Sequence, residues 1–187
     1  SETIQAQGTL TVRDATISDA SILQGVNGDG LIVTGDATLE NVLIQTNTQL
    51  SDSALLRLEN TTNGGTIFND GGTVIRLGGD FTLSQLGTLD GTGKLIELSG
   101  TMDLEDDTLV VGGNLGNWQL SGGTIVGGTI NGASAGDALQ LTRNFHNLPS
   151  GGVVVNADLD FSGGGELRTL DGLTFHWTAT LGGHATL

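Results

Sequence analysis

The 187-residue sequence contains no cysteine, one proline (Pro149) and only six basic residues. Without cysteine, neither a disulfide framework nor a thiolate metal site can form. The six basic residues stand against 21 acidic ones, which gives a net charge of −15. This balance disfavours binding to nucleic acid or to an anionic membrane, because phosphate groups are recognised by clustered Lys and Arg. No apolar run is long enough to cross a bilayer, so we predict no membrane span in this segment.

Helical patterning is also missing from the sequence. Glycine occurs 32 times and threonine is frequent, and both residues are unfavourable inside helices. Threonine loses rotamer freedom there, and glycine loses backbone entropy. Short alternating runs of apolar and polar residues, bounded by Gly, Asn or Asp, are typical of β-strands. The sequence therefore predicts an all-β chain.

What the sequence does contain is a repeat of about 22 residues, the period of a solenoid. One aliphatic ladder consists of Ile22, Ile44, Ile67, Leu89, Leu109 and Ile125. A second ladder runs five residues ahead of it (six at Leu83) and consists of Ile17, Leu39, Thr62, Leu83, Leu104 and Leu120. We expect each ladder to form a column of stacked side chains inside the fold.

The clearest copies are residues 8–22 (GTLTVRDATISDASI) and residues 30–44 (GLIVTGDATLENVLI). Each copy contains three short strand-like runs, which can wind one turn of a parallel β-helix. We predict a single right-handed parallel β-helix of about eight or nine coils, each of roughly 16–23 residues and carrying three short strands. Right-handed winding is favoured because coils near this length with variable corners are typical of it.

We expect one β-solenoid domain over residues 1–187. Residues 1–130 form regular coils, residues 131–152 form an enlarged loop around Pro149, and residues 153–187 form less regular coils. The first residues (SETIQAQGTL) and the last (TATLGGHATL) both resemble the repeat and neither resembles a cap for an open strand edge. We therefore expect the chain to be a segment of a longer polypeptide.

Three aspartates, Asp14, Asp36 and Asp80, are predicted to occupy the same position of the repeat, just before the second strand. Carboxylates stacked in adjacent coils could share a calcium ion, which prefers several oxygen ligands. The favoured alternative is structural, because aspartate often ends a turn by accepting hydrogen bonds from nearby backbone N–H groups. No other cofactor is predicted.

Further polar features are predicted to be structural. Arg57, Arg76 and Glu97 occupy matching positions in LLRL, VIRL and LIEL, which predicts a solvated stack on an outer face. The acidic run at residues 103–107 (DLEDD) is predicted to be a solvated turn. No GxSxG or HExxH motif is present, so no catalytic residue is assigned.

The phrases GGTIVGGTI, GTLDGTGKLIELSG and GGTVIRLGGDFTL resemble the β-helix repeats of autotransporter passengers and filamentous-haemagglutinin-like adhesins. The resemblance implies an extracellular or cell-surface bacterial protein, a stalk or an adhesive surface that contacts glycans or other cell-surface molecules. It supplies no catalytic residues. Two alternatives stay open: a polysaccharide-cleaving β-helix enzyme of the pectate-lyase or polygalacturonase kind, and a trimeric phage tail-spike segment.

Overall fold

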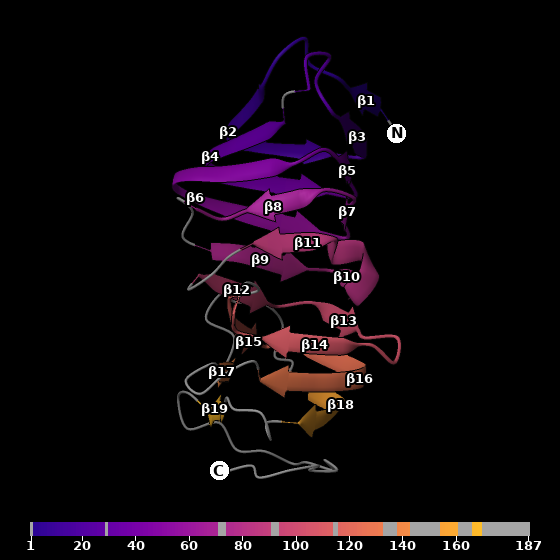
Figure 1. Cartoon of the computed structure of the whole chain (residues 1–187), viewed down its shortest axis with the longest axis vertical. Helices are drawn as coiled ribbons and strands as arrows, with labels where there is room; N and C mark the ends of the chain where they lie inside the picture. Colours follow the sequence, from indigo (N-terminus) through magenta and orange to yellow (C-terminus); the bar gives the residue numbers. More distant parts are fainter. Residues whose placement is uncertain are drawn as a thin grey trace.

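The computed structural model describes residues 2–28, 30–70, 74–90, 94–113, 116–132, 138–142, 154–160 and 166–169. These residues form a parallel β-solenoid of about 6 turns, with the strands stacked along the long axis of the molecule (Figure 1). The predicted all-β parallel solenoid is thus confirmed, with about 6 turns described instead of the eight or nine expected. The right-handed winding stays a prediction.

Short strands make up almost the whole described part of the chain. In chain order they are β1 (Glu2–Ile4), β2 (Leu10–Ser18), β3 (Ala20–Leu23), β4 (Leu31–Glu40), β5 (Leu43–Gln45), β6 (Thr48–Glu59), β7 (Thr62–Asn63), β8 (Thr66–Phe68), β9 (Val74–Gly78), β10 (Asp80–Thr82), β11 (Thr88–Asp90), β12 (Leu95–Leu98), β13 (Thr101–Asp103), β14 (Thr108–Val111), β15 (Asn117–Ser121), β16 (Thr124–Gly132), β17 (Ala138–Thr142), β18 (Val154–Asp160) and β19 (Glu166–Thr169). One short 3-10 helix, η1 (Leu83–Leu86), follows β10. No helix within the described ranges is long and apolar enough to cross a membrane.

The strands pair in parallel and form three sheets. Strands β2, β4 and β6 are long because each covers two sides of its coil. The register of β2 against β4 shifts between Arg13 and Ala15, and that of β4 against β6 shifts between Thr34 and Asp36. From β8 onward separate strands cover these two sides. The third side consists of β1, β3, β5 and β7 in the first coils, and of β10, β13 and the first part of β16 after that. The second part of β16 pairs with β14 instead.

One corner of the coil repeats a left-handed backbone conformation. Asp19, Asn41, Asn60 and Gly79 have φ values of 54°, 53°, 48° and 74° in four successive coils. Asp and Asn tolerate this region better than most residues, and glycine adopts it without steric cost. The amide of Asn41 also donates to Asp19 Oδ1 at 3.3 Å. This corner explains why Asx residues and glycine recur in the repeat.

The core is a set of aliphatic columns that run from coil to coil. We call one of them the leucine column; it includes Ile17, Leu39, Leu58, Leu77, Leu98 and Leu120. All of these members after Ile17 are 0% exposed. Ile17 lies in β2, which pairs with only one neighbouring strand, and it is half-buried. Each leucine therefore packs between equivalent side chains about 4.8 Å above and below it.

The first predicted ladder is confirmed only in part. Ile22 stacks on Ile44, and Ile67 stacks beside Leu89, as expected. However, the residue paired with Ile44 in the next coil is Asn63, which belongs to another sheet from Ile67. The first ladder therefore joins two columns on different sides of the coil.

The second predicted ladder is confirmed at Ile17, Leu39 and Leu120, and it is wrong at the three positions between Leu39 and Leu120. Leu58 takes the place expected for Thr62, and Leu77 takes the place expected for Leu83. Successive members of the leucine column are separated by 22, 19, 19, 21 and 22 residues. Because the coils differ in length, a ladder drawn at a nearly constant spacing leaves the buried column after the first two members and meets it again at Leu120.

The segment 131–152 differs from the predicted enlarged loop. Residues Ala138–Thr142 form β17, which pairs with β15 and β19 and so belongs to the solenoid. The alternating sequence ALQLT is a strand pattern that the loop prediction overlooked. Residues 133–137 and 143–153, including Pro149, lie outside the described residues, as do residues 161–165 and 170–187 of the final predicted coils.

Candidate functional site

Asp14 and Asp36 lie in neighbouring coils, as predicted, where β2 and β4 bend. Asp14 has a positive φ of 47°, and its Oδ1 accepts a hydrogen bond from the backbone N–H of Asp36 at 3.0 Å. Gly35, with a φ of 69°, packs directly against this carboxylate, and a Cβ at that position would collide with it. The Asp14 carboxylate thus fixes the backbone of the next coil, which is the predicted structural alternative.

Asp80 lies at a different corner, so the three aspartates do not converge. It pairs with Thr101 on the third side of the coil, whereas Asp36 pairs with Leu55 in β6. The backbone N–H of Asp80 donates to Asn60 Oδ1 at 2.8 Å. The predicted equivalence of Asp80 is wrong because the same pattern, an apolar run followed by Gly and Asp, occurs at two different corners. Asp36 follows the first side of its coil, whereas Asp80 follows the second side.

Metal ligands are not gathered at either corner. Within the described ranges, no group of three or more His, Asp or Glu side chains is arranged to hold a metal ion. Calcium binding by Asp14 and Asp36 alone stays a prediction. Any such ion would compete with the backbone hydrogen bond that Asp14 already accepts from Asp36.

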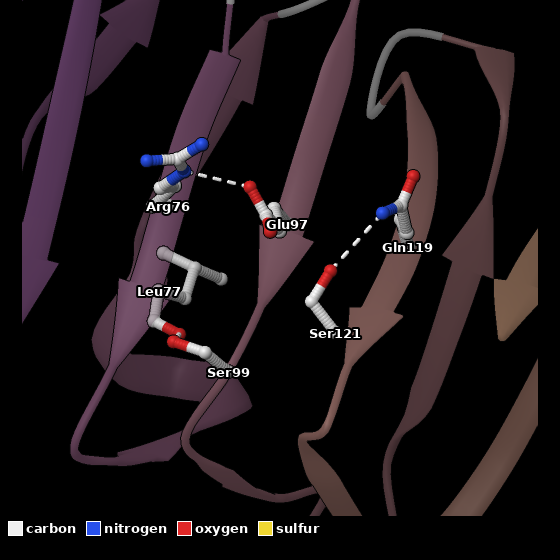
Figure 2. Close-up of polar contacts among 6 residues, drawn as sticks. All are labelled: Arg76, Leu77, Glu97, Ser99, Gln119 and Ser121. Atoms are coloured by element: carbon white, nitrogen blue, oxygen red, sulfur yellow. Dashed lines mark hydrogen bonds and ion pairs between the residues drawn. The ribbon is translucent and has the colours of Figure 1, made fainter. Parts of the chain in front are cut away.

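The predicted stack of Arg57, Arg76 and Glu97 is present in the predicted register on the outward side of β6, β9 and β12. Arg76 Nε donates to Glu97 Oε2 at 2.7 Å (Figure 2). Only 5% of Glu97 is exposed, so the prediction of a fully solvated stack is wrong for this residue. A buried carboxylate held by a guanidinium is a structural contact whose loss is costly.

The same outward row continues into β15. Gln119 pairs with Glu97 in register, and its Nε2 donates to the Ser121 hydroxyl at 3.0 Å (Figure 2). One strand earlier, the hydroxyl of Ser99 donates to the carbonyl oxygen of Leu77 at 3.3 Å. The Ser99 contact links neighbouring coils, whereas the Gln119–Ser121 contact lies within β15.

Two glutamates stack at the ends of β4 and β6, where Glu40 pairs with Glu59. The Ser18 hydroxyl donates to Glu40 Oε2 at 3.4 Å from the coil before. Burial raises the pKa of Glu59, and the charge of Glu40 raises it further, while Arg57 acts in the opposite direction. In-register stacking thus places two like charges side by side, at some cost in stability.

The acidic run at residues 103–107 forms an exposed turn, as predicted. Glu105 and Asp106 have positive φ values of 51° and 68°. Asp103 Oδ1 accepts a hydrogen bond from the backbone N–H of Glu105 at 3.0 Å. The Ser84 hydroxyl, in η1, donates to Glu105 Oε2 at 3.3 Å.

A cavity of about 280 Å³ lies beside the corner that leads into β6. Thr46 and Thr48, which line it, are 5% and 0% exposed, and the hydroxyl of each lacks a hydrogen-bond partner. The lining residues are Thr9, Gln24, Gly28, Gly30, Leu31, Ile32, Thr46, Asn47, Thr48, Gln49 and Phe68. The repeat pattern does not predict this cavity, although QTNTQL places threonine at two interior positions where other coils carry aliphatic residues.

Comparison with protein-family models, with curated proteins and with solved structures finds no match to this chain. Its role must therefore be inferred from its own residues.

Proposed function

We propose that the chain is a non-catalytic structural segment, a stalk or adhesive surface, of a secreted or surface-anchored bacterial protein. The observation that carries this proposal is the leucine column, which passes without a polar interruption from Leu39 to Leu120. In a solenoid, each coil is stabilised mainly by its neighbours. An uninterrupted column makes successive coils one continuous body, which suits a spacer.

The surface supports the same role. A net charge of −15 keeps the solenoid soluble and disfavours phosphate-rich partners such as nucleic acid. The expected partners are glycans, other cell-surface molecules and flanking parts of the same polypeptide. The proposed location is extracellular or at the bacterial cell surface, in line with the resemblance of the repeats to those of surface adhesins.

The enzymatic alternative depended on an acidic groove. A polysaccharide-cleaving β-helix would need Asp14, Asp36 and Asp80 to meet near an arginine, and Asp80 lies at another corner. Among the described side chains, the one arginine paired with these aspartates is Arg13, whose Nε lies 3.5 Å from Asp14 Oδ2 in a highly exposed position. An exposed pair of this kind contributes little, so the geometry favours the structural role.

Product release from a panel of acidic and neutral polysaccharides tests the proposal, with calcium present and then chelated. We expect no release under either condition. Release that disappears in Asp36→Ala but persists in the matched control Asp80→Ala would contradict the proposal and identify the aspartate corner as an active site. Molar mass from light scattering on the same sample separates a monomeric stalk from a trimeric tail-spike segment.

A further inference from the structure

The sequence contains three Asn–Gly pairs, and the structure places them in three different environments. They are Asn27–Gly28, Asn63–Gly64 and Asn131–Gly132. Asparagine followed by glycine is the pair most prone to spontaneous deamidation, because no Cβ hinders the approach of the glycine nitrogen to the asparagine side chain. The dipeptide is the same in all three pairs, so the fold decides which of them can react.

The first pair, Asn27–Gly28, lies in the loop between β3 and β4, near the end of the solenoid that carries the N-terminus (Figure 1). Both residues are exposed, and Val26 beside them is 58% exposed. Gly28 has a φ of 83°, and the nearest atom to a Cβ built there is Gln24 Nε2 at 3.9 Å. An exposed and uncrowded loop opens locally at a low cost in free energy.

Few contacts restrain this first pair. Asn27 Nδ2 donates to the carbonyl oxygen of Gln7 at 2.8 Å in an exposed hydrogen bond. The backbone N–H of Gly28 donates to the carbonyl oxygen of Gly25 at 2.9 Å within the same loop. Both hydrogen bonds must open before the Gly28 nitrogen can attack. Because the pair is exposed, water can replace both partners, so opening costs little.

The second pair is fixed by the fold. Asn63 is 2% exposed and stacks on Ile44. Its Nδ2 donates to the carbonyl oxygens of Gly65 at 3.0 Å and Leu86 at 2.9 Å, and its Oδ1 accepts from the backbone N–H of Gly65 at 3.1 Å. The N–H of Gly64 donates to the carbonyl oxygen of Ile44 at 2.7 Å. Deamidation here requires all of these contacts to open away from water.

The third pair lies inside β16. Asn131 pairs in register with Val110 of β14 and with Asp160 of β18, so strands flank it on both sides. Gly132 is buried and pairs with Val111. A strand fixed between two neighbours resists the backbone rotation that brings the glycine nitrogen to the asparagine side chain.

We infer that Asn27–Gly28 is a self-modification site, where the folded chain deamidates with water as the co-reactant. The backbone nitrogen of Gly28 loses its proton to solvent and forms a bond to Cγ of Asn27. The bond between Cγ and Nδ2 then breaks, and Nδ2 takes up a proton and leaves as ammonia. Water opens the resulting five-membered succinimide ring. Opening at Cγ gives aspartate, and opening at the main-chain carbonyl gives isoaspartate.

The modification changes a contact between the first coils. Asn27 Nδ2 donates to the carbonyl oxygen of Gln7, whereas a carboxylate has no N–H to donate and places its charge beside that oxygen. One backbone and one side-chain hydrogen bond also join residues 5–7 to residues 24–27. Deamidation should therefore loosen the link between these two segments without severing it.

The test follows all three pairs in one sample of the whole chain. The folded protein is incubated in mildly alkaline buffer below its melting temperature, and aliquots are digested with trypsin. Cleavage after Lys and Arg puts the pairs in separate peptides, residues 14–57, 58–76 and 95–143. Mass spectrometry measures the loss of asparagine from each peptide, and electron-based fragmentation distinguishes isoaspartate from aspartate. We expect Asn27 to convert at least about tenfold faster than the other two asparagines, the effect of one protecting hydrogen bond.

Controls separate the fold from the dipeptide. In urea the three pairs lose their different surroundings and should convert at similar rates. Asn27→Gln should abolish rapid conversion in the peptide 14–57, whereas the matched variant Asn41→Gln, in the same peptide, should leave it unchanged. Asn27→Asp carries one of the two products, and its amides at residues 5–7 should exchange hydrogen faster than those of the parent. Unchanged exchange would overturn the effect on the first coils.

The inference is overturned if Asn27 converts no faster than Asn63 or Asn131 in the folded chain. It is also overturned if Asn27→Gln leaves the conversion unchanged, because another residue is then the reactive one. Conversion of Asn27 more than about tenfold slower in the folded chain than in urea would overturn it as well, since the fold then protects this pair. Equal differences between the pairs in urea and in buffer would show that the fold is not the cause.

Discussion

Two columns of the same sheet differ in one residue type. The leucine column is aliphatic throughout and is fully buried from Leu39 to Leu120. A second column, which we call the threonine column, consists of Leu10, Leu31, Thr48, Ile67 and Leu89. Its central member is a buried threonine without a hydrogen-bond partner, beside a cavity. The comparison indicates that a buried polar residue interrupts one interior column of the sheet, whereas the leucine column continues without such an interruption.

The largest effect is expected from breaking the leucine column. Leu77→Ala removes a side chain with 0% exposure that packs between Leu58 and Leu98. We expect the free energy of unfolding to fall by about 2–5 kcal/mol, the usual cost of such a cavity. Denaturant unfolding followed by circular dichroism measures the change.

The control for that experiment is Leu43→Ala, a truncation of the same residue type in β5, where 37% of Leu43 is exposed. Its cost should be less than half that of Leu77→Ala, because less apolar surface is lost from the interior. Equal losses for both variants would mean that the leucine column has no special role.

The outward side of the same strands should give the next largest effect. Arg76→Met removes the cation that lies 2.7 Å from the buried Glu97 carboxylate. We expect a loss of about 2–3 kcal/mol, below the usual cost of breaking a fully buried pair because the Arg76 side chain is 21% exposed. The double variant Arg76→Met/Glu97→Gln should regain part of this loss. Failure to regain any of it would show that the charge of Glu97 is not the cause.

The threonine column should respond in the opposite direction. Thr48→Val replaces an unpartnered buried hydroxyl by a methyl group, and we expect the free energy of unfolding to rise by about 1 kcal/mol. Thermal unfolding measures this rise. A loss of stability of similar size would show that the Thr48 hydroxyl has a partner in solution and would remove the contrast between the two columns.

The smallest effect is a pH dependence at the stacked glutamates. The pKa of Glu59 is raised in the folded state, by burial first and by Glu40 second. A raised carboxyl pKa means that the charged form destabilises the fold, so stability is lost as the pH rises through the folded pKa and recovered as it falls.

Glu59→Gln should therefore melt at a higher temperature than the parent at pH 7, and the difference should shrink as the pH is lowered toward the ordinary pKa of glutamate. Thermal melts across this pH range measure the difference. The control Glu2→Gln, at an exposed position, should show little pH-dependent difference. A constant difference for Glu59→Gln would contradict the assigned cause.

The class of fold could be predicted from the sequence because strand alternation and a coil-length period are local patterns. The register could not, since the coils have unequal lengths and Asn63, a polar residue, stacks on Ile44. Of the polar features, the alignment of Arg57, Arg76 and Glu97 was visible in matching tetrapeptides. The burial of Glu97 and the cavity beside Thr48 depend on contacts between coils, which no single repeat reveals.

Hydrogen exchange at single backbone amides tests the contrast between the two columns most directly. We expect the amides of β6, β9 and β12 along the leucine column to exchange most slowly. Amides of residues 46–48, around the unpartnered hydroxyl of Thr48, should exchange faster. Uniform exchange along both columns would contradict this contrast.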